Sequence, residues 1–323
     1  GLINTHTHAA MVLYRGLGND LNLQDWLTRY IFPAEGKTVS PEFVRAGTKL
    51  AALEMILGGT TTFVDMYYFE EEVAEAAKEA GIRGVLGQTI IRFPVADAKT
   101  PEESLARTRR FAARYKGDAL VTPAVAPHSM YTLSAETLQS ADRLARELGI
   151  PLLIHLEETK QERDDSLAAH RESPTAYLSR LGLLGRHVLG AHGVWLGPED
   201  IDLLVSSGTA ISHNPESNMK LASGTAPVPA LLAAGVRVGL GTDGAASNND
   251  LDMFEAMRVA SFLDKVHTLD PTVGSAQTVL EMATLGGAAA LGMSSSIGSL
   301  EPGKRADLIV VNVSAARQTP VYD

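Results

Sequence analysis

Residues 1–8, Gly-Leu-Ile-Asn-Thr-His-Thr-His, place two histidines behind a short apolar run. Side chains at positions i and i+2 of an extended strand point to the same face, so this run predicts a strand on which His6 and His8 bind one metal ion together. A zinc site of this kind has about four ligands, and a catalytic one leaves a position open for water. The remaining ligands must come from elsewhere in the chain.

Outward from this strand, apolar β-rich runs alternate with helical patterns. Further strands are predicted over residues 60–65, 84–91, 120–126, 151–155, 187–191, 209–212 and 236–242. Helices are predicted over residues 43–57, 70–80, 101–115, 134–148, 174–184, 198–207 and 228–234. With the opening strand this makes about eight strand–helix units, the number that closes an α/β (β/α)₈ barrel of the TIM type. Strands buried on both faces are expected to be continuously apolar, as these runs are.

Three regions lie outside this alternation. Residues 11–37 are polar and aromatic and too irregular for one amphipathic helix, so a long functional loop is expected there. Residues 251–291 predict two or three helices. An apolar run at 306–311 predicts a last strand beyond the barrel. We therefore expect a barrel domain over 1–297 and part of a small β-sandwich domain over 298–323.

The composition restricts the classes of partner. The 323 residues suit one α/β barrel of ~250 residues with an appendage. The net charge of -10 offers no basic surface for nucleic acid, so a small neutral or zwitterionic ligand is expected. The absence of cysteine excludes thiolate metal sites and cysteine nucleophiles. No apolar run approaches the ~18 residues of a membrane span and nothing resembles a signal peptide, which predicts a cytoplasmic protein without membrane contact.

Polar residues gather where the predicted strands end. In barrels of this type the active site is built from the C-terminal ends of the strands. Six of the nine histidines fall there, although histidines without a shared role would be scattered. The strand-end residues are His6, His8, His128, His155, His192 and His213, with Glu158 three residues after His155 and Asp243 after the last barrel strand.

Each of these residues also has a structural interpretation when it is taken alone. A His-x-His pair is a weak signal, and a single His155 or His192 is more often a hydrogen-bonded core residue. Asp243 could cap the turn that follows it, and His213 is better explained as a residue that orders its loop. The joint pattern, with histidines ending the first, fifth and sixth strands and an aspartate ending the eighth, favours a metal site.

The pattern resembles the amidohydrolase superfamily, and in detail its 5′-methylthioadenosine/S-adenosylhomocysteine deaminases. The matching stretches are residues 4–11 (NTHTHAAM), 59–67 (GTTTFVDMY), 127–132 (PHSMYT), 155–159 (HLEET), 213–224 (HNPESNMKLASG) and 241–249 (GTDGAASNN). The resemblance covers essentially the whole chain. These motifs specify the superfamily strongly but the substrate less so, because guanine, cytosine and triazine hydrolases look similar at the metal.

The resemblance implies a role for each strand-end residue. The metal ligands would be His6, His8, His155 and Asp243. Glu158 would transfer protons, Asp243 would also act as a base, and His192 would orient the attacking water or steady the developing charge. The expected cofactor is one divalent metal ion, zinc (Zn2+) first, with Fe2+ and Mn2+ as alternatives. Such an ion lowers the pKa of its water from 15.7 to about 7.

The resemblance also implies substrate contacts. Glu35 would meet the ribose hydroxyls, although the same residue can be interpreted as an exposed loop carboxylate. His128 would face the purine or the ribose. Trp26 would form an apolar wall, and Arg92 would be a further contact.

The implied activity is that of a hydrolase acting on C–N bonds, a purine nucleoside deaminase. It would convert S-adenosylhomocysteine or 5′-methylthioadenosine, and adenosine as a third candidate, to the inosine analogue and ammonia. The alternatives are another amidohydrolase, such as a guanine or cytosine deaminase or a triazine chlorohydrolase, and a barrel that binds metal or ligand without turnover. One metal ion is expected rather than two, because residues 121–128 lack the lysine that usually holds a second ion in this superfamily. A homo-oligomer is expected on the same resemblance.

Overall fold

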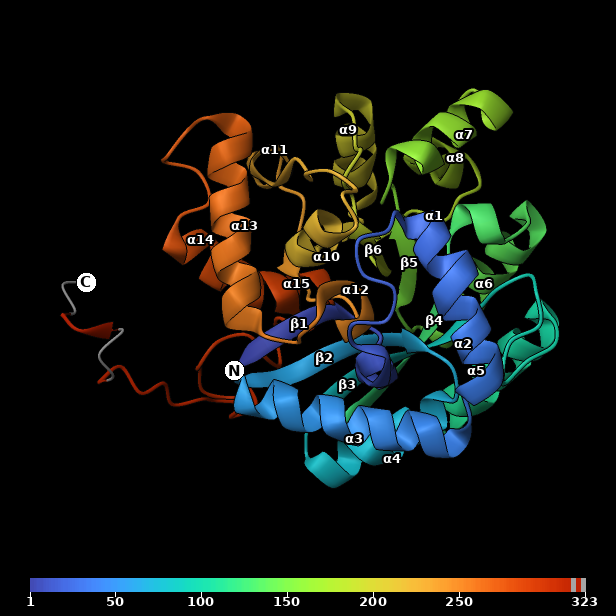
Figure 1. Ribbon diagram of the computed structural model, residues 1–323, viewed down its shortest axis with the longest axis horizontal. Coiled ribbons are helices and arrows are strands. Elements are labelled where there is room, and N and C mark those ends of the chain that lie inside the picture. The colour runs from blue at the N-terminus through green and yellow to red at the C-terminus, as the bar shows by residue number, and fades with distance from the viewer. Residues whose placement is uncertain (315–317, 321–323) are drawn as a thin grey trace.

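The computed structural model describes residues 1–314 and 318–320 of the chain. Its centre is one sheet of eight parallel strands that follow each other in chain order (Figure 1). The strands are β1 (Leu2–Thr7), β2 (Thr60–Tyr67), β3 (Arg83–Ile90), β4 (Val121–Pro127), β5 (Leu152–Leu156), β6 (Val188–His192), β7 (Ala210–His213) and β8 (Val238–Leu240). The chain after β8 returns to β1, where the Asp243 amide donates to the His6 carbonyl at 2.9 Å. The predicted (β/α)₈ barrel is confirmed.

Helices surround the strands on the outside (Figure 1). They are η1 (Ala9–Tyr14), α1 (Leu23–Trp26), η2 (Leu27–Ile31), α2 (Phe32–Thr38), α3 (Pro41–Leu57), α4 (Glu70–Ala80), α5 (Pro101–Arg114), η3 (Met130–Thr132), α6 (Ala135–Leu148), α7 (Lys160–His170), α8 (Pro174–Arg180), α9 (Pro198–Ser207), α10 (Pro215–Lys220), α11 (Val228–Ala233), α12 (Ala245–Asn248), α13 (Met253–Thr268), α14 (Ala276–Glu281), η4 (Met282–Gly286) and α15 (Gly287–Ala290). Within the described residues, none of these helices is long and apolar enough to cross a membrane.

Local sequence signals explain how strand and helix alternate. Helix α3 begins where the Ser40 hydroxyl accepts from the Phe43 amide at 3.2 Å, with Pro41 at the first helical position. Strand β2 begins with Thr60, Thr61 and Thr62, whose β-branched side chains favour the extended backbone. Most of β2 is buried, as expected for a strand with barrel interior on one side and helices on the other.

The barrel closes tightly beneath the ends of its strands. A Cβ added at Gly241 would lie 2.5 Å from the Asn214 side-chain oxygen and 2.9 Å from the His6 amide nitrogen. No larger residue fits there without displacing the backbone of β1, so glycine lets the first and last strands approach each other next to the polar cluster.

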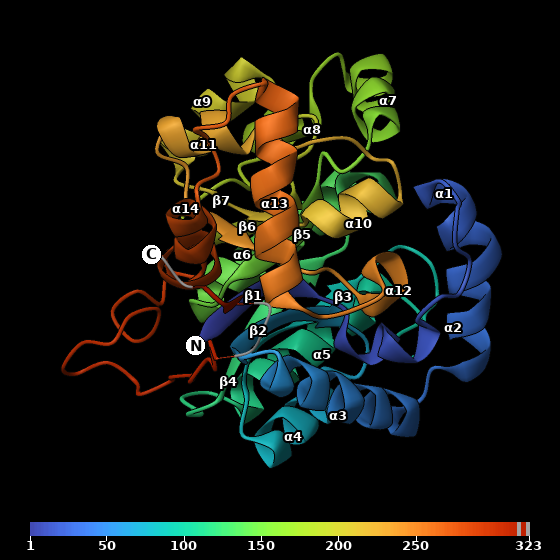
Figure 2. The same ribbon diagram turned by 60° about the vertical axis from the view of Figure 1, so that its left-hand side comes forward.

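Residues 11–37, expected to form a long loop, are instead largely helical. Short helices η1, α1, η2 and α2 follow one another and lie over the open end of the barrel (Figures 1 and 2). Asn22 caps α1 by accepting from the Asp25 amide at 2.9 Å. The expectation failed because each helix is too short to show a complete amphipathic period, and Gly16 and Gly18 interrupt the pattern with positive φ angles.

The predicted strand over 306–311 is absent from the structure. This segment runs along the outside of the barrel without pairing as a strand among the described residues (Figure 2). Asp307 anchors it, since its backbone carbonyl accepts from the Gly1 amine and its carboxylate lies 3.1 Å from the Arg83 guanidinium. An extended apolar run becomes a strand only where another strand offers hydrogen bonds. The division at residue 297 stays a prediction.

Candidate active site

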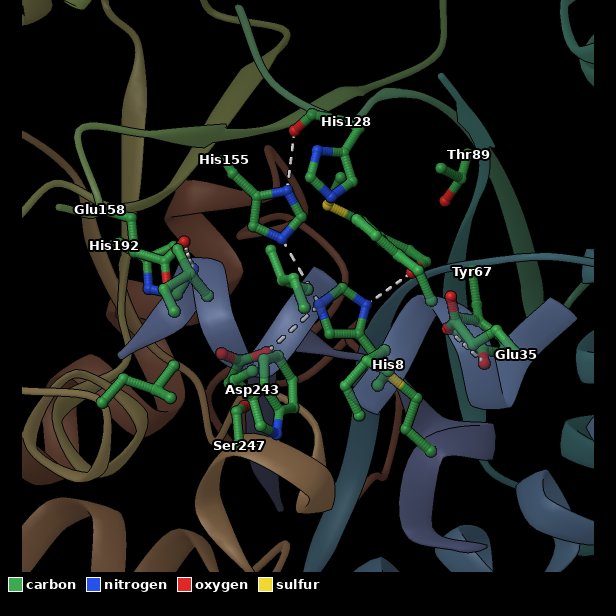
Figure 3. A pocket seen from close by; sticks show the side chains of 18 of the residues that line it. His8, Glu35, Tyr67, Thr89, His128, His155, Glu158, His192, Asp243 and Ser247 are labelled. Carbon is green, nitrogen blue, oxygen red and sulfur yellow. Dashed lines mark hydrogen bonds and ion pairs between the residues drawn. The ribbon is translucent and has the colours of Figure 1, made fainter. Parts of the chain in front are cut away.

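Four polar side chains, those of His6, His8, His155 and Asp243, converge at the C-terminal ends of β1, β5 and β8. Figure 3 shows three of them, His8, His155 and Asp243. The Asp243 Oδ1 atom lies 3.3 Å from His8 Nε2 and 3.5 Å from His6 Nε2. His8 Nε2 lies 3.4 Å from His155 Nε2. Ligands about 2.0–2.1 Å from a zinc ion in a tetrahedral arrangement are separated by roughly 3.3 Å. The three observed separations are therefore close to those of atoms that share one ion. His6, His8 and Asp243 form one possible metal group, and His155 approaches it through His8.

Hydrogen bonds behind the imidazoles direct one nitrogen of each ring into this cluster. The Nδ1–H of His8 donates to the Met66 carbonyl at 2.6 Å, and that of His155 donates to the His128 carbonyl at 2.7 Å. A carbonyl only accepts, so both rings carry the proton on Nδ1 and turn a lone pair on Nε2 toward the cluster. His6 Nε2 is buried and has no hydrogen-bond partner within the described residues. These donors suit a divalent metal ion.

His192 lies beside the cluster but is held in the opposite tautomer. Its Nδ1 accepts from the Asn218 side-chain amide at 3.0 Å and from that of Asn214 at 3.3 Å. The proton of the neutral ring is therefore on Nε2, which faces Glu158 Oε2 at 3.8 Å. Although nitrogens of His6, His155 and His192 approach one another within 4.8 Å, an N–H group does not coordinate a metal. These hydrogen bonds favour the prediction that His192 is a hydrogen-bond donor over a fourth imidazole ligand.

The backbone is strained at two of these positions. His192 has φ 81° and Asp243 has φ 63°, the left-handed region that residues other than glycine rarely adopt. Each such residue costs about 1–3 kcal/mol and persists where the surrounding structure holds it. For Asp243, Ser217 Oγ donates to Oδ2 and the Gly244 amide donates to Oδ1, both at 2.7 Å. These bonds aim the carboxylate at the cluster.

The pKa values of two acids of the site, Asp243 and Glu158, are shifted in opposite directions. Burial alone raises the pKa of Asp243, but the facing His6 and His8 imidazoles and the Ser217 hydroxyl outweigh it and hold that pKa below its ordinary value. Burial, with the negative charge of Asp243 and then of Glu162, raises the pKa of Glu158 well above the ordinary glutamate value. These shifts favour the carboxylate form of Asp243 and the protonated form of Glu158, which would let Glu158 give up a proton.

A cavity extends from this cluster to a second acid. Glu35 lies across the cavity from Glu158 and His192 (Figure 3), and its carboxylate accepts from the Tyr67 hydroxyl at 2.8 Å. Burial raises the pKa of Glu35 to about 7, against the opposing effect of this hydrogen bond. Apolar walls with a few convergent polar groups are typical of small-molecule sites.

The structure brings nine of the ten predicted site residues to one place. His8, Trp26, Glu35, His128, His155, Glu158, His192 and Asp243 line the cavity, and His6 lies beneath it in the cluster. Arg92 does not line the cavity; it follows β3 with an exposed side chain. The roles of all ten residues stay predictions.

Several residues of the site were not among those predicted. Tyr67, Asn214, Ser217 and Asn218 act on the predicted residues through hydrogen bonds. All four lie inside the motifs that carry the family resemblance, which was the available signal. Their partners are distant in sequence, so spacing alone could not indicate which residue each one holds.

Comparison with known proteins agrees with this geometry. Residues 1–322 match the amidohydrolase family. The chain belongs to the amidohydrolase family. It is 48% identical over 323 residues to a protein of Thermodesulfovibrio yellowstonii and 50% identical over 323 residues to one of Syntrophobacter fumaroxidans, each named 5-methylthioadenosine/S-adenosylhomocysteine deaminase. Both alignments cover 100% of this chain and 74% of the relative.

Solved structures extend the likeness. An adenosine deaminase from Xanthomonas campestris with bound zinc is 43% identical, with a TM-score of 0.98, and the alignment covers 100% of this chain and 74% of that one. The zinc-bound atrazine chlorohydrolase of Arthrobacter aurescens has a TM-score of 0.91 at 23% identity, with coverage of 100% and 77%. At 23% identity this likeness shows a common fold and nothing about activity. The chlorohydrolase alternative therefore gains no support from it.

Proposed function

We propose that the chain is a zinc-dependent aminohydrolase that removes the C6 amine from the adenine of S-adenosylhomocysteine or 5′-methylthioadenosine, with adenosine as a further candidate. The products would be the inosine analogue and ammonia. The observation that carries this proposal is the buried acid Glu158, whose pKa is raised, beside the metal-ligating side chains of His6, His8 and Asp243, with Glu35 across the same cavity. The names of the relatives with near 50% identity support the substrate, and the zinc of the Xanthomonas relative supports the metal.

Each residue then has a chemical task. His6, His8, His155 and Asp243 would hold the ion, which supplies an activated water for attack at neutral pH. Asp243, as a carboxylate, accepts a proton from that water, and Glu158 gives its own proton to a ring nitrogen of adenine. The Nε2–H of His192 stabilises the oxygen that becomes attached to C6. Glu158, once it has regained the proton that Asp243 took from the water, would deliver it to the departing amine, and the proton of the C6 hydroxyl would then return to Glu158.

Ammonia release from zinc-analysed protein tests this function directly. S-adenosylhomocysteine, 5′-methylthioadenosine, adenosine, guanine and cytosine would be offered side by side. We expect turnover of the thioether nucleosides and little or none of the free bases. Turnover of a free base alone would refute the nucleoside assignment but retain the deaminase chemistry. Ligand binding without ammonia release from any compound would favour the non-catalytic alternative.

Replacing Glu35 should affect nucleosides selectively. Removing a charged hydrogen-bond partner of the ribose in E35A costs about 1.5–3 kcal/mol, which predicts a roughly ten- to hundredfold loss in kcat/KM. A free base that reacts at all has no ribose and should be affected much less. Y67F, which removes only the hydroxyl that donates to Glu35, is the matched control and should lose less. An equal loss on nucleoside and free base in E35A would remove Glu35 from ribose binding.

Nucleoside binding should depend on the ionisation of Glu35. Burial raises the pKa of this carboxyl to about 7, so it is neutral at lower pH and becomes a carboxylate as pH rises. Ribose hydroxyls donate to a carboxylate, so the Kd of the product 5′-methylthioinosine should fall as pH rises from about 6 to about 8. Direct binding is measured because activation of the catalytic water affects turnover in the same pH range. The dependence should disappear in E35Q, and its persistence there would assign it to another group.

Other expectations from the family resemblance remain proposals. We propose a β-sandwich contribution from residues 298–323, of which 315–317 and 321–323 lie outside the described part of the chain. A homo-oligomer, a cytoplasmic location and substrate contacts from His128 and Trp26 are likewise proposed. Contact from Arg92 stays a prediction that we do not carry further, because its exposed side chain does not line the cavity. His128 and Trp26 are supported by their place in the cavity wall.

A further inference from the structure

The charged side chains that line the cavity are all acids. Glu35 and Glu158 face each other across it, and Asp243 belongs to the metal cluster. No lysine or arginine lines it within the described residues. On the proposed function, on which this inference rests, the three acids are committed to the ribose, the adenine ring and the metal. A charged 5′ tail would therefore meet no dedicated partner inside the cavity.

The helices over the cavity contribute an apolar surface. Leu23, Trp26, Leu27, Ile31 and Phe32, from α1, η2 and α2, line the space on the side of Glu35. The Trp26 indole N–H donates to the Leu17 carbonyl at 3.1 Å, so its polar atom is already bonded within the protein. Such a surface binds an alkyl thioether well and leaves a carboxylate or ammonium group without hydrogen bonds.

Cations near the lining residues in sequence are paired elsewhere or exposed. Arg29 of η2 is exposed and lies 3.7 Å from the Asp25 carboxylate, and Lys160 lies 2.6 Å from that of Asp164. Lys220, next to the lining residue Leu221, donates to the Ala246 carbonyl at 2.9 Å and to Asn249 Oδ1 at 2.8 Å. Arg92 is exposed, and the neighbouring Phe93 ring contacts the Phe32 ring at a centroid distance of 5.3 Å. Phe32, the lining member of this aromatic pair, thus presents an apolar ring to the cavity.

We infer that this cavity selects a nucleoside with an uncharged 5′ substituent, so that 5′-methylthioadenosine is the preferred substrate and S-adenosylhomocysteine is a poor one. The amino acid end of the homocysteine tail would have to stay hydrated outside the apolar surface. Phe32 is the specificity-determining residue, because it lies one helical turn before Glu35 on α2 and lines the same cavity.

Steady-state ammonia release from the zinc-loaded protein tests the inference with three nucleosides. These are 5′-methylthioadenosine, S-adenosylhomocysteine and 5′-butylthio-5′-deoxyadenosine, whose tail has the carbon chain of homocysteine without its charges. We expect kcat/KM for both neutral thioethers to exceed that for S-adenosylhomocysteine by at least roughly tenfold, the effect of one unpaired charged group. Equal or faster turnover of S-adenosylhomocysteine would overturn the inference while leaving the deaminase function intact. If the butylthio compound falls with S-adenosylhomocysteine, tail length decides and the charge argument is wrong.

A pair of variants at Phe32 adds a gain of function. F32R places a cation at the apolar surface and should raise the ratio of S-adenosylhomocysteine to 5′-methylthioadenosine turnover by roughly tenfold. F32L, the apolar control, should keep the wild-type ratio. An unchanged ratio in a folded, zinc-loaded F32R would overturn the role of Phe32. The wild-type comparison decides the substrate preference even if F32R does not fold. Failure of every nucleoside to react refutes the deaminase function, and this inference with it.

Discussion

The variant E158Q should retain its zinc and lose roughly 10²–10⁴-fold in kcat for nucleoside deamination, the usual contribution of general acid–base catalysis. Glutamine preserves the size of the side chain and its place in the cavity, but an amide cannot give a proton to the purine ring or to the departing amine. Glu158 makes none of the short contacts that join His6, His8, His155 and Asp243. Metal analysis together with ammonia release at saturating substrate measures both parts of the prediction.

The adjacent glutamate provides a matched control. Glu157 is also buried, but its carboxylate points away from the cavity, where it accepts from Arg163 at 2.6 Å and from the Thr175 hydroxyl at 2.8 Å. E157Q should lower the free energy of unfolding and keep most of the kcat of the folded protein. Near-wild-type activity in E158Q would remove Glu158 from the proton transfers. Loss of zinc in E158Q would instead make it part of the metal shell.

The barrel was predictable where local signals agree with burial. Helices α4 and α9 match their predicted bounds because glycines at their ends, Gly81 and Gly208, adopt positive φ angles that stop the helix. Helix α7 was missed because it buries only Glu162 and Ser166 and therefore has no apolar periodicity. Helix prediction from one sequence depends on apolar periodicity and capping residues. A surface helix with few apolar residues, such as α7, shows no such periodicity and is therefore not predicted.

The sequence predicted where the site lies in the barrel, but it did not predict which hydrogen bonds hold the site residues. The strand-end histidines mark the correct end of the barrel, because parallel strands bring their C-terminal ends to one face. The tautomer of His192 could not be predicted, since it depends on Asn214 and Asn218 from the segment after β7. The burial of Glu35 likewise depends on Tyr67, which the fold brings from β2 to α2. Long-range pairs of this kind exist only once the barrel has formed.

Two histidine variants should separate a metal ligand from a hydrogen-bond donor. H155A removes an imidazole whose Nε2 faces the cluster, so its zinc Kd should rise by more than the roughly 10–100-fold expected for loss of an outer partner. H192A removes a ring whose Nδ1 is occupied by Asn218 and whose Nε2 carries the proton, so it should keep zinc near stoichiometry.

Activity alone would not distinguish these variants, because both should lose kcat by at least roughly 10²-fold, H155A through the metal and H192A through the donor to the developing oxygen. Metal analysis after dialysis against a weak chelator does distinguish them, and adding zinc back should raise the activity of H155A but not of H192A. If H192A loses zinc as readily as H155A, the Asn218 hydrogen bond does not set the tautomer and His192 is a ligand. If H155A keeps its zinc, His6, His8 and Asp243 bind the ion without an imidazole from β5, and His155 is not a required ligand.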